Sequence, residues 1–159
     1  MEADPESGAG GELLRLAAAV IERHGLELVE LRLRGSGGSR VLRVDIDRPG
    51  PRGVSIEDCQ RVSQALGAEF DARDLLPFSY ALQVSSPGVE RPIRSADDIR
   101  RNIGRRVRVQ TEDATSGRRS FRGRLLGAEG GVLLLETSAG ATLELRLDSV
   151  IEARQDLPF

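Results

Sequence analysis

Arginine residues are concentrated in one segment of this 159-residue chain. Residues 100–124 contain nine arginines and two acidic residues, whereas the chain as a whole has a formal net charge of -2. A guanidinium group binds a phosphate or a carboxylate through two parallel hydrogen bonds. The segment therefore predicts contact with RNA backbone or with an acidic protein surface, and the residues expected to make it are Arg105, Arg106, Arg108, Arg118, Arg119, Arg122 and Arg124.

The spacing of these arginines predicts a shared surface. Side chains two residues apart point to the same face of a strand, so Arg106 and Arg108 share one face. Arg122 and Arg124 are related in the same way. Two adjacent strands would then present four guanidinium groups together.

A solvated face without a ligand is the alternative for this segment. All 23 basic residues of the chain are arginine, which indicates a coding bias toward this residue. Arg118 and Arg119 are expected in the loop between the two strands. Phe121 is the one aromatic residue among these arginines, so stacking on unpaired bases has little support.

The sequence predicts no catalytic site, no metal site and no cofactor. His24 and Cys59 are single residues of their type, without the repeated spacing of metal ligands. Residues 85–86 are serines outside any G-x-S-x-G motif, and turn hydrogen bonds are the expected role. Asp45 and Asp47 alternate on one strand face and would suit magnesium, but such residues more often keep a sheet edge soluble. We therefore expect a binding protein and not an enzyme.

The first half of the chain predicts an α-β-β-α-β domain. A helical apolar pattern within 11–25 is followed by two alternating strands at 26–34 and 40–47. A second helix begins after Ser55, with Asp58 in the capping-box position, and 80–85 forms a third strand. This order predicts a small sheet covered on one face by two helices. The core positions expected are Leu13, Ala17, Val20, Ile21 and His24, then Val29, Leu31, Leu33, Leu42, Val44 and Ile46, and finally Ile56, Cys59, Val62, Leu66 and Phe70.

The second half predicts a short helix and a β-rich domain. Ser95 is expected to cap the helix and Gly104 to end it. Four strands follow at 105–111, 119–128, 131–138 and 141–150, and their regular spacing predicts a small closed barrel. Gly123 lies within the second of these strands, where a barrel requires a sharp bend.

Residues 83–93, QVSSPGVERPI, predict a stiff connection between two domains. Pro87 and Gly88 suit the central positions of a type II turn, in which the second residue has a positive φ. The boundaries expected are a disordered tail at 1–11, a domain at 12–86, a rigid linker at 87–94 and a domain at 95–159. The linker residues of interest are Ser85, Ser86, Pro87, Gly88, Glu90, Arg91 and Pro92.

The segment from Tyr80 to Ile93 resembles the signature of the bacterial ribosome maturation factor RimP family. In that family an aromatic residue, a strand, Ser-Ser-Pro-Gly, an acid, Arg and Pro join two domains. The resemblance extends over roughly residues 12–155. It implies an Sm-like (SH3-type) barrel after the first domain, which itself has a KH-like appearance.

The resemblance implies a cytoplasmic, non-enzymatic factor that binds the free small (30S) ribosomal subunit and assists its late assembly. Small-subunit ribosomal protein twelve is an implied partner, and ribosomal RNA is a further one. The alternative is a general RNA-binding module without a role in assembly, although no GXXG loop of the KH type is present.

Composition and charge agree with such a factor. A single cysteine excludes an internal disulfide and suits a reducing cytosol. The acidic, glycine-rich start is expected to be neither a signal peptide nor a membrane span. Glu30, Asp45, Asp47 and Asp58 give the first domain an acidic character that would complement a basic ribosomal protein. Solvated faces without a ligand are the alternative for these residues.

Overall fold

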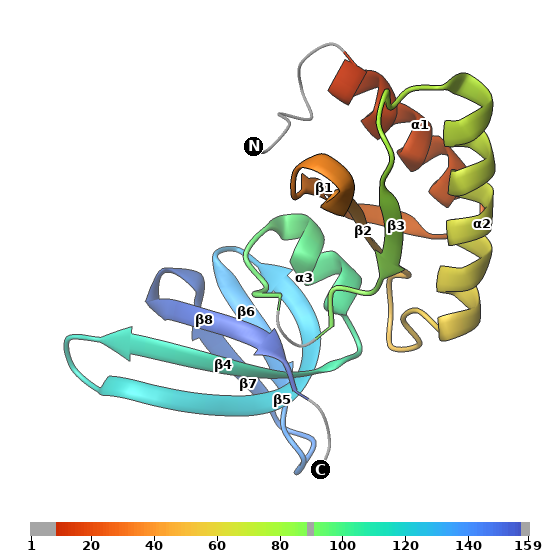
Figure 1. The fold of residues 1–159 in the computed structure, drawn as a ribbon. Coiled ribbons are helices and arrows are strands. Elements are labelled where there is room, and N and C mark those ends of the chain that lie inside the picture. Colours follow the sequence, from red (N-terminus) through yellow and green to blue (C-terminus); the bar gives the residue numbers. More distant parts are fainter. Residues whose placement is uncertain (1–8, 89–90, 157–159) are drawn as a thin grey trace. The chain divides into compact units, whose positions relative to one another are not determined.

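The computed structural model describes residues 9–88 and 91–156 as two compact units (Figure 1). Unit 1 takes the residues up to Arg48 and then Gly53–Pro87. Unit 2 takes Pro49–Arg52 and the residues from Gly88 onward. The second unit is therefore built from two separate stretches of the chain.

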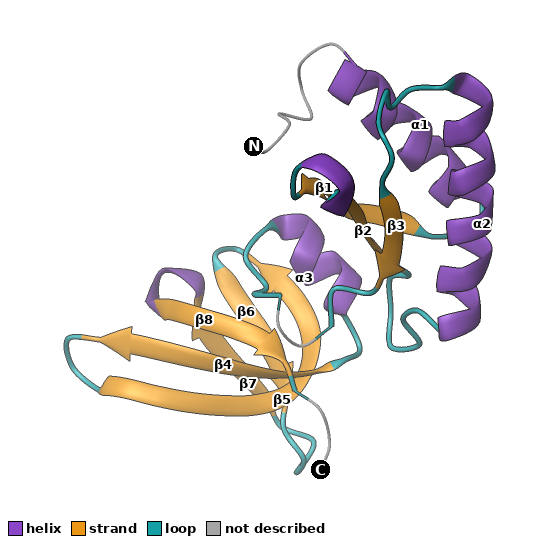
Figure 2. Cartoon of the chain, viewed as in Figure 1, coloured by secondary structure: helices purple, strands orange, loops and turns teal. Residues whose placement is uncertain are grey.

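Unit 1 has the predicted α-β-β-α-β order. Its elements are α1 (Ala9–Arg23), β1 (Glu27–Arg34), the 3-10 turn η1 (Gly37–Ser39), β2 (Val41–Asp47), α2 (Ile56–Arg73) and β3 (Ala81–Ser85). The strands form one sheet in the order β1-β2-β3. β1 and β2 are antiparallel, whereas β2 and β3 are parallel because α2 returns the chain to the same end of the sheet. Both helices cover one face of this sheet (Figure 2).

The core of unit 1 lies between the two helices and the sheet. Alternation along β2 places Leu42, Val44 and Ile46 against the helices, as predicted. The predicted capping box is also confirmed, since Ser55 Oγ accepts from the N–H of Asp58 and the Asp58 carboxylate accepts from the N–H of Ser55. The other fully or nearly fully buried apolar residues are Leu13, Ala17, Val20, Ile21, Leu26, Val62, Leu66 and Phe70.

Three predictions about unit 1 are wrong in detail. Ile56 is 76% exposed, because it lies about 80° around the helix from the centre of the buried stripe of α2. A register shift between Leu28 and Glu30 makes Val29 the extra residue of a bulge, so Leu28 packs on the core instead. Helix α1 begins at Ala9, whereas the disordered tail was expected to run to residue 11. Glu12 in the first turn favours this helix start, and residues 1–8 lie outside the described residues.

Unit 2 contains one short helix and five strands. Its elements are α3 (Ala96–Asn102), β4 (Arg106–Asp113), β5 (Gly117–Glu129), β6 (Val132–Glu136), β7 (Thr142–Arg146), the 3-10 turn η2 (Leu147–Ser149) and β8 (Val150–Gln155). The predicted fourth strand, 141–150, corresponds to β7 and η2, and a fifth strand that was not predicted, β8, follows it. Its core consists of Val107, Val109, Leu125, Leu133, Leu135, Leu145 and Ala153.

The sheet of unit 2 is not a closed barrel. Its hydrogen-bonded order is β7-β6-β5-β4-β8. The edge strands β7 and β8 each pair with a single neighbouring strand and not with each other. The chain turns through η2 after β7, and β8 then pairs with β4. The predicted closure is therefore not confirmed.

Strand β5 bends across this sheet at the predicted glycine. Its first part pairs with β4 up to Arg124, and its second part pairs with β6 from Arg124 to Glu129. A Cβ atom placed on Gly123 would lie 2.7 Å from the carbonyl oxygen of Glu136 on β6. Close backbone approach is thus the reason for a glycine at this position.

Candidate functional site

The paired strands β4 and β5 bring four of the predicted arginines onto one face. Arg106 lies opposite Arg124 and Arg108 lies opposite Arg122 in the antiparallel register. Residues directly opposite each other have their side chains on the same face. All four side chains are exposed. We call these four residues the arginine face, and its predicted composition is confirmed.

Acidic residues on β6 and immediately after β8 accompany three members of the arginine face. Arg106 Nε lies 3.2 Å from Asp156 Oδ2, and Arg122 Nε lies 3.9 Å from the same oxygen. Arg124 donates to Glu136 Oε1 at 2.7 Å. These pairs hold the guanidinium groups in place, but their exposure limits what each contributes to folding stability.

Arg108 differs from the other three because it makes no ion pair or hydrogen bond through its side chain within the described ranges 9–88 and 91–156. Arg154 on β8 lies beside it in register and pairs with Glu152. The hydrogen bond from Arg154 lowers the pKa of Glu152, and the charges of Arg154, Arg108 and Arg94 add to this effect. Arg108 is thus the member of the face with an exposed guanidinium group ready for an anion.

Arg118 and Arg119 lie in strand β5 and not in a loop, which corrects the prediction. The register of β4 and β5 continues to Asp113 opposite Gly117, so the turn between them is short. The Asp113 carboxylate stabilises this turn by accepting from the backbone N–H groups of Thr115 and Ser116, at 2.8 and 2.5 Å. Those hydrogen bonds, that of Ser116 first, lower the pKa of Asp113.

The two arginines point to opposite faces because they are consecutive in a strand. Arg118 Nε lies 3.4 Å from Glu112 Oε2. The guanidinium carbon of Arg119 lies 5.0 Å from the ring centroid of Phe121, a cation–π distance. The predicted seven-arginine cluster is therefore not one surface.

Arg105 is a structural residue of unit 2. Its relative exposure is 8%, and its Nε donates to the carbonyl oxygen of Gly50 at 2.7 Å. Its Nη1 lies 3.4 Å from Asn102 Oδ1. A buried guanidinium group that satisfies a backbone carbonyl is not available to a large ligand, so the prediction for Arg105 is wrong.

The linker residues divide between the two units. Ser85, at the end of β3, donates from its hydroxyl to Asp45 Oδ1 at 3.0 Å, and does not make the predicted turn bond. Ser86 and Pro87 end unit 1, and Gly88 has a φ of 64°, the positive value predicted for it. Glu90 lies outside the described residues.

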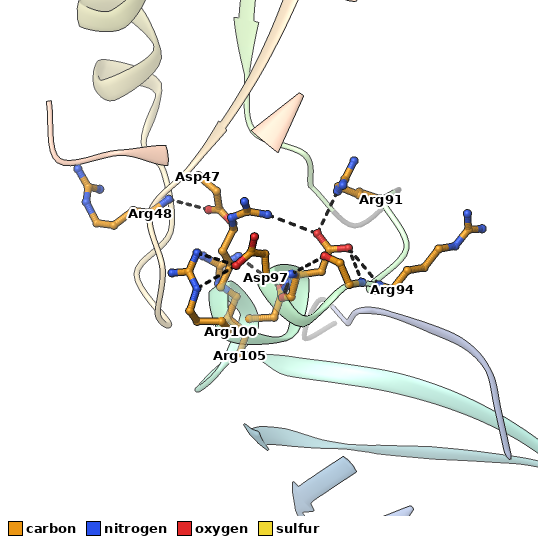
Figure 3. A network of polar contacts seen from close by, with 11 residues as sticks. Asp47, Arg48, Arg91, Arg94, Asp97, Arg100 and Arg105 are labelled. Carbon is orange, nitrogen blue, oxygen red and sulfur yellow. Dashed lines mark hydrogen bonds and ion pairs between the residues drawn. The ribbon is translucent and has the colours of Figure 1, made fainter. Parts of the chain in front are cut away.

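On the other side of the linker, Asp98 organises the start of α3. Figure 3 labels its neighbours Arg91, Arg94 and Asp97. Its carboxylate accepts from the backbone N–H groups of Arg94 and Ser95, both at 3.1 Å, and Arg91 Nε lies 3.4 Å away. Burial opposes ionisation of Asp98, but the hydrogen bonds from Ser95 and Arg94 and the charge of Arg91 lower its pKa. After Pro92, the N–H of Ile93 donates to Ala153 on β8 at 2.8 Å.

The acidic residues of unit 1 do not form the predicted open surface. Asp45, Asp47 and Asp58 are all buried. Asp45 accepts from Arg43 and Ser85, and Asp47 accepts from the N–H of Arg48 at 2.9 Å. These carboxylates serve the fold of unit 1, because each satisfies neighbouring donors.

The remaining candidates for chemistry have structural surroundings. The ring Nδ1 of His24 lies 2.9 Å from the carbonyl oxygen of Val20, one helical turn earlier. Burial raises the pKa of the Cys59 thiol, and the charge of Asp58 adds to this, which disfavours the nucleophilic thiolate. Within the described part of the chain, no three His, Cys, Asp or Glu side chains are grouped to hold a metal ion. None of the helices in that part is long and apolar enough to cross a membrane.

Sequence reasoning missed Arg154 and Asp156, which flank the arginine face. Both belong to the neighbourhood of β8, the strand that was not predicted. The alternation of Glu152, Ala153 and Arg154 was the available signal, but the bulge opposite Thr111 interrupts it at Ile151.

Similarity to known protein families agrees with this architecture. The family model described as the RimP N-terminal domain matches residues 16–90. The match runs from the middle of α1 through β3 and includes the Ser-Ser-Pro-Gly segment that carries the sequence resemblance. Residues 16–90 therefore form a RimP N-terminal domain, which supports membership of the chain in the RimP family.

Proposed function

We propose that this protein is a ribosome maturation factor that binds the free small (30S) ribosomal subunit and assists its late assembly without catalysing a reaction. The RimP N-terminal domain at residues 16–90 is the observation that carries this proposal. A factor of this kind acts by binding one assembly state more tightly than the others. A cytoplasmic location is part of the proposal.

The arginine face of unit 2 is the proposed contact with the subunit. Four exposed guanidinium groups on two paired strands suit the phosphates of ribosomal RNA. Arg108 is the member expected to contribute most, because binding a phosphate there does not require an existing ion pair to break. Phe121, the aromatic residue of β5, lies on the opposite face of that strand from Arg122 and Arg124, which favours backbone contacts over readout of bases.

Small-subunit ribosomal protein twelve remains a proposed partner on the strength of the family resemblance. The burial of Asp45, Asp47 and Asp58 removes these three residues from such a contact.

Co-sedimentation with ribosomal particles tests the function directly. Purified protein is mixed with free small subunits or with complete ribosomes and centrifuged through a sucrose gradient. We expect the protein to move with free small subunits and to be depleted from complete ribosomes. Equal binding to both particles, or to neither, contradicts the proposal.

Substitution Arg108→Glu tests the arginine face. We expect it to weaken binding to the small subunit at least about tenfold, because it replaces a phosphate partner with a repelling charge. Arg146→Glu is the matched control. Arg146 is an exposed arginine at the end of edge strand β7, and it pairs with Asp148 in the following turn η2. Equal losses in the two variants would show a general charge effect and not a site.

Salt dependence separates this function from the alternative of a general RNA-binding module. Four phosphate contacts predict a log–log slope of binding against salt of about -2.8 to -3.6, at about 0.7 to 0.9 per phosphate. A general module should show that slope, and similar affinity, on unrelated naked RNA. A maturation factor should prefer the assembled small subunit over naked RNA at every salt concentration.

A further inference from the structure

Unit 2 contains an apolar groove that the arginine face does not line. Its volume is about 860 Å³, within the range of ligand and peptide pockets. Its lining reaches down to the core residues Val107, Leu125 and Leu133, which are themselves buried, so the exposed part of the groove is formed by its walls. None of the four arginine-face residues contributes to it. The groove thus has a different lining from the arginine face, although Arg118 lies on the same strand as Arg122 and Arg124.

The walls of the groove expose large aliphatic side chains. Ile103, at the end of α3, is 40% exposed, Leu147 on η2 is 37% exposed and Ile151 on β8 is 49% exposed. Ile151 is placed there by the bulge that leaves it without a register partner on β4. Three large apolar side chains around one hollow are more than scattered surface hydrophobic residues, and such a patch indicates a binding surface.

The charged residues that line the groove are mainly basic. They are Arg94, Arg100, Arg118 and Glu152. Arg100 pairs with Asp97 and Arg118 pairs with Glu112. The guanidinium group of Arg94 makes no ion pair or hydrogen bond within the described part of unit 2, and Figure 3 shows it extending away from the other labelled residues. The charge of Arg94 also acts on Glu152, the one acidic residue of the lining, and contributes to its lowered pKa. Three arginines against one glutamate still make the lining complementary to an apolar ligand with negative charge beside it.

The lining also distinguishes between protein and RNA as the ligand. Bases are held by aromatic stacking and by polar groups that read their edges. The groove has no aromatic lining residue, and Gln110 is its one side-chain amide. Aliphatic walls instead suit aliphatic side chains.

We propose that this groove docks an extended segment of a partner protein that carries leucine, isoleucine or valine side chains between acidic residues. The aliphatic side chains enter between Ile103, Leu147 and Ile151, and a carboxylate pairs with Arg94. This interaction is independent of the proposed contact between the arginine face and the ribosomal subunit.

Fluorescence anisotropy with a synthetic peptide tests the proposal. The probe is a fluorescein-labelled peptide with two adjacent leucines flanked on each side by two glutamates. Two control peptides replace the leucines with serines or the glutamates with lysines. We expect the full-length protein to bind the leucine–glutamate peptide at least about tenfold more tightly than either control. Failure to bind it, or equal binding of all three peptides, overturns the proposal.

Matched variants of the protein locate the binding. Ile151→Asp should weaken binding at least about tenfold, because it places a carboxylate among the aliphatic side chains. Leu126→Asp is the control, since Leu126 is 36% exposed on β5 but does not line the groove. Arg94→Glu should weaken binding, and Arg108→Glu should not. Far-UV circular dichroism confirms that each variant is folded.

The pattern of losses distinguishes the possible results. Suppose that Arg108→Glu weakens binding of the peptide and Ile151→Asp does not. The peptide then binds the arginine face by charge alone, and the groove proposal is wrong. If Leu126→Asp has the same effect as Ile151→Asp, the effect is not local to the groove and the proposal is again wrong. Neither result bears on sedimentation with small subunits, so the two proposals fail separately.

Discussion

The carboxylate of Asp58 joins the loop before α2 to the helix itself. It accepts from Arg48 Nη1 at 2.8 Å, from Arg61 Nη2 at 2.5 Å and from the N–H of Ser55 at 2.9 Å. The hydrogen bond from Arg48, followed by that from Ser55, lowers the pKa of Asp58 strongly despite its burial. The same pair raises the pKa of Arg48. Asp58 therefore stays ionised in the folded protein and satisfies several donors at once.

Substitution Asp58→Asn should destabilise unit 1 by about 1.5–3 kcal/mol, the range for a hydrogen bond to a charged group. Urea denaturation followed by far-UV circular dichroism measures this change. Asp97→Asn is the control, because Asp97 is an exposed acid in the first turn of α3 that does not cap the helix. It should change stability by no more than about 0.5 kcal/mol.

The contribution of Asp58 should also depend on pH. Its pKa is lower in the folded state than the unfolded value of about 3.9, so its stabilisation is fully present above that value. The stabilisation is lost as the pH falls below about 4 toward the folded-state pKa. The difference between wild type and Asp58→Asn should therefore be larger at pH 7 than at pH 3. A constant difference would show that ionisation of Asp58 is not the cause.

Individual residues show where sequence reasoning succeeds and where it stops. Ser55 and Asp58 were predictable as a capping box because that motif is local, with its partners three residues apart. The structural role of Arg105 was not predictable, because its partner Gly50 lies 55 positions earlier in the chain. Nothing in the arginine segment itself distinguishes this buried guanidinium group from the exposed one of Arg108.

At the scale of elements, the bend in β5 depends on the small size of Gly123. The Cβ of Gly123→Ala would meet the Glu136 carbonyl oxygen at 2.7 Å and Leu135 Cβ at 3.3 Å. Strand β6 must then move, and we expect a destabilisation of unit 2 of about 1–3 kcal/mol, as for other overpacked sites. Hydrogen exchange measured by mass spectrometry should show faster exchange in β5 and β6, with unit 1 unchanged.

Gly67→Ala is the matched control for that substitution. Gly67 lies in α2 with no neighbouring atom within 4 Å of an added Cβ, and its φ is not positive. We expect a stabilisation of about 0.4–1 kcal/mol, because alanine restricts the unfolded chain more than glycine does. Equal destabilisation by both substitutions would argue against a specific clash at Gly123.

The elements also show why the sheet of unit 1 was easier to predict than that of unit 2. Uninterrupted alternation in β2 identified the core face correctly. In β1 and β8, one extra residue at a bulge shifts the alternation, and a bulge has no signature in the residue types of these strands. Closure of a barrel depends on pairing between the two edge strands, which the spacing of strands along the chain does not determine.

For the whole molecule, the proline-containing linker is predicted to limit the arrangements available to two binding units. Replacing both Pro87 and Pro92 with alanine keeps Arg91, the partner of Asp98, and relaxes the backbone. If both units contact the small subunit at once, this variant should bind it several-fold more weakly, since bivalent binding contributes up to roughly 10²–10⁴ in avidity. Sedimentation with small subunits measures the loss, and unchanged affinity would contradict a role for linker stiffness.

The four residues Pro49–Arg52 have a consequence for any attempt to divide this protein. They precede α2 in the chain but belong to unit 2, where Gly50 accepts from Arg105 and donates from its N–H to Arg101 at 3.0 Å. A recombinant fragment that begins at the linker would lack them. Transferring unit 2 into another protein would therefore require Pro49–Arg52 as well. Division of the chain at the Ser-Ser-Pro-Gly segment does not give two complete units.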